Sequence, residues 1–155
     1  MTARHGTAEW YGDVKRGSGT ITVGDDVFAD DYSYSARFAD GRGTNPEQLL
    51  AAAHSGCFTM ALAEVLSTAG HTVKSLHSRA RVWLYHVDGQ PTLYSIYLDT
   101  VGDVPGINQH QFQTYAEQAK DECPVSWALT GIPEIFLTAR ICGAHSATQP
   151  PPSTR

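Results

Sequence analysis

Residues 44–70 read Thr-Asn-Pro-Glu-Gln-Leu-Leu-Ala-Ala-Ala-His-Ser-Gly-Cys-Phe-Thr-Met-Ala-Leu-Ala-Glu-Val-Leu-Ser-Thr-Ala-Gly. The stretch has the signals of one long helix, because its first two residues can cap the first turn, the next is a proline, and the last is a glycine. No residue between Gln48 and Ala63 is charged when histidine is neutral, and apolar residues lie on all sides of the helical wheel. Such a helix is normally buried on nearly all sides. We therefore expect a long buried central helix.

The segments around this helix predict an α+β fold, because strands and two further helices follow one another without a regular βα repeat. Before the helix, strands at 8–13 and 20–23 flank a hairpin loop at 15–19, and residues 32–38 alternate as a strand does. After it, the pattern predicts strands at 76–87 and 92–101 joined by a hairpin turn, helices at 109–122 and 124–129, and a last strand at 134–141.

The composition indicates one soluble domain and excludes several classes of protein. The chain has 155 residues with a net charge of −5 and a mean hydropathy of −0.27, so we expect neither a disordered chain nor a nucleic-acid partner. No apolar run approaches the roughly 20 residues that cross a bilayer, and the first residues lack the apolar segment of a secretory signal. We expect a cytoplasmic protein without membrane contact, with a domain at 1–142 and a flexible Pro-rich tail at 143–155.

The three cysteines are too few, and odd in number, for a disulfide scaffold. Cys57 lies mid-helix among small residues, where a free cysteine often serves only as a small buried hydrophobe. Cys123 precedes Pro124 at the start of a predicted helix, where backbone N–H groups and the helix dipole favour a thiolate. Local physics therefore favours Cys123 as the reactive thiol, and Cys142 has no assigned role.

Cys57 needs a cation from another element to be a thiolate, because it lies about 18 Å along the axis from the helix start. Arg37, Arg42 and His54 are the candidates. His54 precedes Cys57 by three residues and lies on a neighbouring face, where a histidine commonly has a structural role. Read as half of a metal site, His54-x-x-Cys57 finds no second pair of ligands with zinc-site spacing. We therefore expect no metal and no cofactor.

Two segments that each contain a cysteine resemble the two cysteine motifs of the OsmC/Ohr family, the osmotically inducible and organic-hydroperoxide-resistance proteins. They are residues 43–62 and Cys123-Pro-Val-Ser-Trp-Ala-Leu129. The likeness extends to residues 9–19, 34–38 and 104–107 and covers residues 6–141. The combination of Thr-Asn-Pro-Glu with Ala-Ala-His-x-x-Cys is closer to the OsmC branch than to the Ohr branch.

The resemblance implies an OsmC-like fold, with antiparallel sheets around the long buried helix, and a thiol-dependent peroxidase. Cys57 would be the peroxidatic thiolate that attacks the peroxide, and Cys123 the resolving thiol that then forms a disulfide with it. Arg37 would be the activating cation, and Glu47 the carboxylate that positions it. Organic hydroperoxides would be the substrates, with hydrogen peroxide as a further candidate, and an external dithiol, with the lipoyl type among the candidates, would recycle the enzyme.

The spacing of Glu47 and Cys57 indicates that a second chain contributes to the site. They are ten residues apart on one helix, about 15 Å along its axis, which one side chain cannot bridge. If both serve one site, Glu47 most simply belongs to a second chain whose helix runs past the first. The charge-free helix points the same way, and the resemblance implies an intertwined homodimer with sites at its interface.

Substrate preference and two alternative functions stay open. An apolar pocket of Tyr34, Phe58, Met60 and Trp127 would favour organic hydroperoxides, although the same side chains would also suit a core. One alternative is a non-catalytic OsmC-like module that binds a small molecule or only dimerises, with inert buried cysteines. The other is a redox sensor that uses the same disulfide, which the acidic charge and the lack of a DNA-binding helix disfavour.

Overall fold

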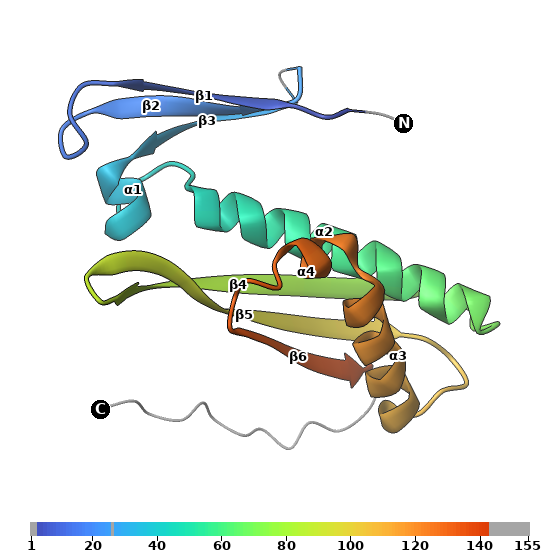
Figure 1. Ribbon diagram of the computed structural model, residues 1–155. Coiled ribbons are helices and arrows are strands. Elements are labelled where there is room, and N and C mark those ends of the chain that lie inside the picture. Colours follow the sequence, from blue (N-terminus) through green and yellow to red (C-terminus); the bar gives the residue numbers. More distant parts are fainter. Residues whose placement is uncertain (1–2, 26, 143–155) are drawn as a thin grey trace.

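The computed structural model describes residues 3–25 and 27–142, which form two three-stranded sheets and four helices (Figure 1). The fold class is α+β, as predicted. In chain order the elements are β1 (Gly6–Tyr11), β2 (Ser18–Val23), β3 (Phe28–Ser33), α1 (Tyr34–Phe38), α2 (Pro46–Thr68), β4 (Ser75–Val87), β5 (Gln90–Asp103), α3 (Gln109–Glu122), α4 (Pro124–Ala128) and β6 (Glu134–Ile141). The tail expected at 143–155 lies outside the described residues, and the domain boundary at 142 stays a prediction.

The two sheets follow chain order, with one departure from the expected antiparallel pairing. β1, β2 and β3 pair antiparallel, and so do β4 and β5, whose predicted turn contains Asp88 and Gly89 at φ 51° and 79°, as a two-residue hairpin requires. β6, however, runs parallel to β5. A parallel neighbour needs a crossover of a dozen or more residues, and α3 and α4 provide that crossover.

α2 has the predicted ends, but within one chain it is buried along one side only. Asn45 caps the helix by accepting a hydrogen bond from the backbone N–H of Gln48 at 2.9 Å, and Gly70 follows its end at φ 83°. The buried side faces β4, α3 and α4 and consists of His54, Phe58, Leu62, Val65 and Leu66. On the other side Met60 is 76% exposed. The expectation of burial all round is therefore wrong for the single chain.

α2 is also, by length and composition, apolar enough to cross a membrane, so the expectation that no apolar run approaches that length is wrong. The core helix of a soluble protein has the same properties. Here Phe58, Leu62 and Leu66 are fully buried in one cluster with Ile96 and Phe112, so one side of α2 packs into the core.

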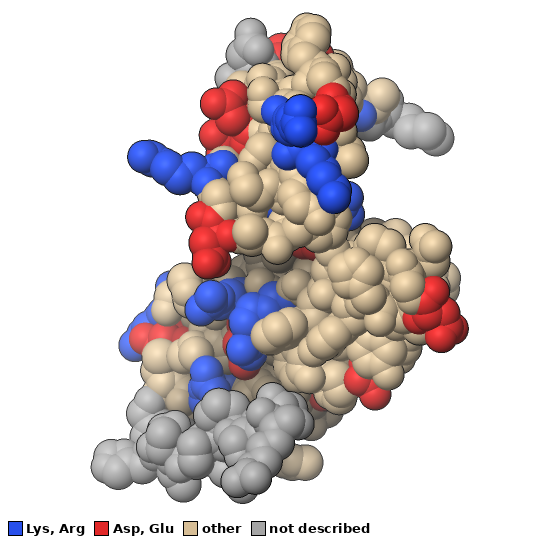
Figure 2. All heavy atoms as spheres, turned by 90° about the vertical axis from the view of Figure 1, so that its left-hand side faces the viewer, with Lys and Arg blue, Asp and Glu red and all other residues tan. Residues whose placement is uncertain are grey.

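The N-terminal sheet has no core of its own. Among the described residues of β1, β2 and β3 only Gly19 is buried, and the sheet contacts the rest of the chain mainly through α1. Figure 2 shows it as a lobe above the body, with positive and negative side chains interspersed on the face in view. A three-stranded sheet needs an apolar face packed on something to be stable.

The short helix α1 replaces the second half of the strand expected at 32–38. The alternation of aromatic and small residues there suited a strand, but Ser33 caps a helix by accepting a hydrogen bond from the backbone N–H of Ala36 at 3.1 Å. The side-chain amide of Asn45 then donates to the Ala36 carbonyl at 2.9 Å. Asn45 thus holds α1 against the start of α2, which decides where Arg37 points.

Candidate active site

Cys57 and Cys123 come together where α2 passes the start of α4. Cys57 lies midway along α2 and is partly exposed, whereas Cys123 is the fully buried N-cap of α4. The two side chains are neighbours close enough for each to shift the pKa of the other, and the backbone N–H of Val125 lowers the pKa of both thiols. Both thiols are free, and their contact suits reversible disulfide formation.

Hydrogen bonding makes Cys123 the more acidic of the two thiols in the single chain. Burial raises the pKa of Cys57, and the neighbouring Cys123 raises that pKa further through hydrogen bonding and charge. Burial also acts to raise the pKa of Cys123, but hydrogen bonds from the backbone N–H and the hydroxyl of Ser126, and from Cys57 and Val125, lower it overall. This direction agrees with the expectation for a cysteine at a helix start, and the role of Cys123 stays a prediction.

His54 is fully buried one turn before Cys57. Its Nε2 lies 2.8 Å from the hydroxyl oxygen of Ser126, and burial lowers the pKa of the imidazole. His54 therefore does not supply the cation that Cys57 requires. Among the described residues no group of three or more His, Cys, Asp or Glu side chains could hold a metal ion.

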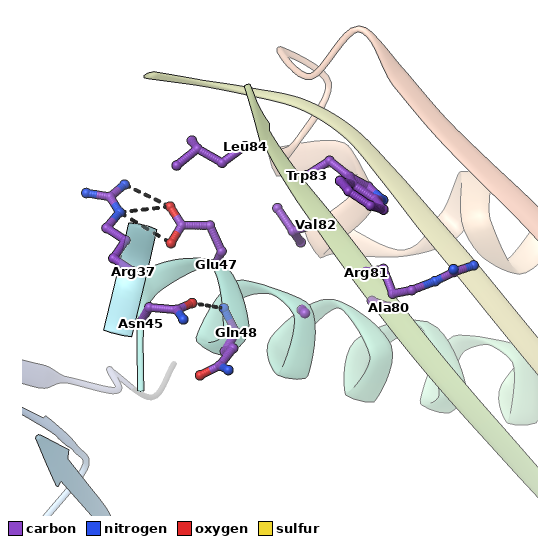
Figure 3. A pocket seen from close by; sticks show the side chains of 10 residues that line it. Arg37, Asn45, Glu47, Gln48, Ala80, Arg81, Val82, Trp83 and Leu84 are labelled. Carbon is purple, nitrogen blue, oxygen red and sulfur yellow. Dashed lines mark hydrogen bonds and ion pairs between the residues drawn. The ribbon is translucent and has the colours of Figure 1, made fainter. Parts of the chain in front are cut away.

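Arg37 and Glu47 form a two-pronged ion pair at the other end of α2 (Figure 3). Nε and Nη2 of Arg37 donate to Oε1 of Glu47 at 3.1 and 2.8 Å, and Nε lies 3.3 Å from Oε2. The Glu47 side chain is 13% exposed and that of Arg37 36%. Together they line a pocket of about 390 Å³ whose far wall is β4, including Val82 and Leu84.

A single chain therefore carries two separate halves of the predicted site. Glu47 lies in the first turn of α2 and binds Arg37 of α1 there. Cys57 lies ten residues after Glu47, about 15 Å along the helix axis. Arg42, the alternative cation, is exposed in the connection between α1 and α2. The geometry joins each predicted residue to one partner, and the catalytic roles of all four stay predictions.

A second pocket is also lined by Arg37, and most of its other lining side chains are aromatic. Its volume is about 380 Å³, and its walls are Trp10, Val14, Tyr32, Ser33, Tyr34, Arg37 and Phe38. Of the four residues expected to form an apolar pocket, only Tyr34 is here. Phe58 belongs to the core, while Met60 and Trp127 are 76% and 71% exposed.

The family model described as "OsmC-like protein" matches residues 39–137 of the chain. The chain belongs to the OsmC family. It is 41% identical to "Peroxiredoxin OsmC" of Escherichia coli K12 over 127 residues, which are 81% of this chain and 89% of that protein. It is 34% identical to an "Organic hydroperoxide resistance protein" of Xanthomonas axonopodis pv. citri over 101 residues, 64% of this chain and 69% of that one.

Solved structures show the same fold. An organic hydroperoxide resistance protein OsmC from Legionella pneumophila superposes with a TM-score of 0.68 at 22% identity, covering 91% of this chain and 98% of that one. A putative organic hydroperoxide resistance protein from Vibrio cholerae, with captopril bound in one of its active sites, gives a TM-score of 0.69 at 24% identity over 92% and 94% of the two chains. The OsmC-like fold and the nearness to the OsmC branch are confirmed.

Ser126 is the residue at this OsmC site that the sequence analysis missed. It contacts both His54 and Cys123 and is nearly buried. A serine two residues after a Cys-Pro pair lies in the first turn of the helix that the pair begins, where its hydroxyl can turn back to the cap. Cys142 is exposed at the end of β6 and takes no part in these contacts.

Proposed function

We propose that this OsmC protein is a cysteine-based peroxidase that reduces organic hydroperoxides and is recycled by an external dithiol. The observation that carries the proposal is the pair of neighbouring free thiols, Cys57 and Cys123. Two thiols in contact, one partly exposed and one buried with a lowered pKa, suit a peroxidatic and a resolving cysteine. The names of the relatives, a peroxiredoxin and an organic hydroperoxide resistance protein, support the same reading.

The reaction has three steps. The Cys57 thiolate attacks the distal oxygen of the hydroperoxide, the O–O bond breaks, and Cys57 becomes a sulfenic acid while the alkoxide leaves and takes a proton from water to become the alcohol. The Cys123 thiolate attacks the Cys57 sulfur, so that a disulfide forms and hydroxide leaves as water after protonation. An external dithiol then reduces the disulfide and is itself oxidised to a disulfide.

We propose further that the working unit is a homodimer in which Arg37 and Glu47 of one chain serve Cys57 of the other. Burial raises the pKa of Cys57, so its thiolate needs a nearby cation. The Arg37 of the same chain is bound to Glu47 in the first turn of α2, about 15 Å along the helix axis from Cys57. The exposed apolar side of α2 and the coreless N-terminal sheet both require cover. A second copy supplies the cover and the cation together.

The aromatic pocket beside Arg37 supports an organic substrate. Its walls are mostly apolar, with a few polar groups including the guanidinium, which is the usual lining of a small-molecule site. An alkyl or aryl group would lie against the rings while the peroxide group faces Arg37. Hydrogen peroxide has no apolar part to use this pocket. A cytoplasmic location suits the free thiols.

The test is a titration of free thiols before and after one equivalent of cumene hydroperoxide. We expect two thiols per chain to disappear within minutes and to return with dithiothreitol, and we expect Cys57→Ser to abolish peroxide consumption. Cys142→Ser is the matched control, because that exposed thiol lies outside the contacts of the site, and it should consume peroxide at the full rate. If Cys57 and Cys123 stay unreacted, the chain is a non-catalytic binding or dimerisation module.

A further inference from the structure

A continuous buried chain of polar groups connects α2 to Cys123. It begins at His54, which is fully buried, passes to the hydroxyl of Ser126 at 2.8 Å, and ends at Cys123 in the same first turn of α4, whose pKa that hydroxyl lowers. His54 and Ser126 are 72 residues apart in the sequence. A buried imidazole in a helix that otherwise packs apolar side chains needs a reason to be there, because burying a polar group has a cost unless it is hydrogen-bonded.

The unpartnered nitrogen of His54 decides the direction of the hydrogen bonds. Its Nδ1 is buried and has no hydrogen-bond partner among residues 3–25 and 27–142. A buried N–H without an acceptor is rarer than an unsatisfied acceptor, so Nδ1 carries no proton and the neutral ring carries its proton on Nε2. His54 then donates to the oxygen of Ser126. The Ser126 hydroxyl proton is left free to donate to the sulfur of Cys123.

We propose that His54 and Ser126 are positioning residues that hold Cys123 ready as a thiolate, so that Cys123 resolves the sulfenic acid and is later the group that leaves when the external dithiol opens the disulfide. The inference rests on the proposed function and deepens it. His54 acts through Ser126, because its ring orients the hydroxyl, and a hydrogen bond to a charged acceptor is about twice as strong as a neutral one.

The difference in exposure between the two sulfurs decides where the dithiol attacks. Cys57 is partly exposed and Cys123 is fully buried, so an external thiolate reaches the Cys57 sulfur. Its attack forms a mixed disulfide on Cys57 and breaks the bond to Cys123, whose sulfur takes the electron pair and leaves as a thiolate. The second thiol of the carrier then attacks the carrier's own sulfur in the mixed disulfide and releases Cys57.

The stabilised thiolate speeds this step, because a less basic thiol leaves faster.

The groups facing Cys123 are consistent with this role. From α2 it meets Cys57, which donates to it, and through Ser126 it meets the neutral His54. On α3, Lys120 is paired with Glu117 at 2.7 Å, while Asp121 and Glu122 are exposed. The lowered pKa of Cys123 thus comes from hydrogen bonds.

The first experiment measures the acid dissociation of Cys123 alone, by thiolate absorbance at 240 nm against pH in a Cys57→Ala, Cys142→Ser background. Ser126→Ala should lower the acid dissociation constant of Cys123 about tenfold. Ser55→Ala is the matched control, since the Ser55 hydroxyl bonds the Ala52 carbonyl of its own helix at 3.1 Å, and it should leave the titration unchanged. Identical curves for the two serine variants would overturn the proposal.

His54 is tested in the same background by a pair of substitutions. His54→Met fills a similar space without a donor and should lower the acid dissociation constant about threefold, whereas His54→Gln keeps an N–H near the Nε2 position and should restore most of it. A purely structural histidine would give two variants with the same titration but different stability. That result would refute the positioning role of His54, and the proposal for Ser126 would then depend on the Ser126→Ala titration.

The second experiment identifies the sulfur that the thiol attacks. The disulfide is formed with diamide, treated with a small amount of glutathione, quenched with N-ethylmaleimide and mapped by mass spectrometry. We expect glutathione on Cys57 and maleimide on Cys123, and the reverse pattern would refute the proposal. Neither experiment uses a peroxide, so a chain that fails to consume cumene hydroperoxide but passes both would refute the proposed peroxidase and keep only the stabilised Cys123 thiolate and its role as leaving group.

Discussion

Mixing two inactive variants should restore activity if each site is built from two chains. Arg37→Ala removes the cation and Cys57→Ser removes the nucleophile, so each homodimer lacks one half of both sites. In a mixed dimer, the Arg37 of the Cys57→Ser chain faces the Cys57 of the Arg37→Ala chain, and one of the two sites is intact. A site within one chain could not be repaired in this way.

The structure allows the size of the effect to be worked out. In a symmetric dimer the two interfaces are equivalent, so random pairing of equal amounts gives about one half mixed dimers with one working site in two, and about one quarter of the wild-type rate. An opposite charge close to the thiolate changes its population about tenfold or more. Because burial raises the pKa of Cys57, the Arg37→Ala homodimer should stay at about one tenth of the wild-type rate or less.

The assay is consumption of cumene hydroperoxide with dithiothreitol after the two variants are unfolded and refolded together. A chain carrying both substitutions, mixed equally with wild type, is the matching control. It should give about one quarter of the wild-type rate if the site is shared and about one half if each chain holds its own site. No recovery in the first mixture, together with one half in the second, would refute the shared site.

Three further predictions concern the Arg37 half of the site and the reactive thiol. Glu47→Gln keeps one acceptor but removes the charge and turns an N–H₂ toward the guanidinium. It should therefore lower the free energy of unfolding by about 1 kcal/mol and the rate of peroxide consumption about tenfold. The control is Asp99→Asn, which breaks the comparable 2.8 Å ion pair between β4 and β5 and should cost similar stability in urea denaturation with an unchanged rate. Gly43→Ala should destabilise the chain by roughly 1–3 kcal/mol in the same measurement, because Gly43 has φ 111° and a Cβ there would collide with a β3 carbonyl; a smaller loss than that of an exposed Gly89→Ala would contradict this reading. The residual rate of Arg37→Ala should rise with pH from neutral to alkaline, since the raised pKa of Cys57 leaves its thiol protonated at pH 7, and a flat pH profile would show that the arginine does not act through thiolate formation.

Sequence patterns predicted those elements whose signals are local. Asn45, Pro46 and Gly70 mark α2 because caps and stops act on the residues beside them. The turn at Asp88 and Gly89 was predicted correctly, because its signal also lies in the turn residues themselves. The alternation along β6 was correct as well, because a strand with one face on a core repeats every two residues.

The errors arose where tertiary contacts or a neighbouring cap decided between two local possibilities. The alternation at 32–38 suited a strand, but Ser33 and the amide of Asn45 together hold the second half as a helix. The parallel placement of β6 depends on how α3 and α4 return the chain, which no strand pattern contains. The same limit applies to the pocket, since Phe58 and Met60 are two residues apart on α2 and lie in the core and at the surface respectively.

The candidate site divides in the same way. The position of Cys123 at a helix start is a local fact, and its favoured thiolate followed from the sequence. The hydrogen bond of His54 to Ser126 spans 72 residues, and only the fold brings the two together. The Arg37 and Glu47 pairing was implied by the family resemblance, and the geometry shows the contact that local reasoning could not find.

The exposed side of α2 allows the relation between two copies to be argued one step further. When two antiparallel helices are related by a two-fold axis, a residue of one helix lies opposite a residue of the other if the average of their two numbers is the number of the residue at the axis. Glu47 lies opposite the Cys57 of a second copy if the axis crosses α2 at Ala52, the midpoint of the two positions. Ala52 is exposed, as are Ala53 and Gly56 beside it, and such small residues let two backbones approach closely. The same apolar surface that requires cover is therefore the surface across which the two halves of the site can meet.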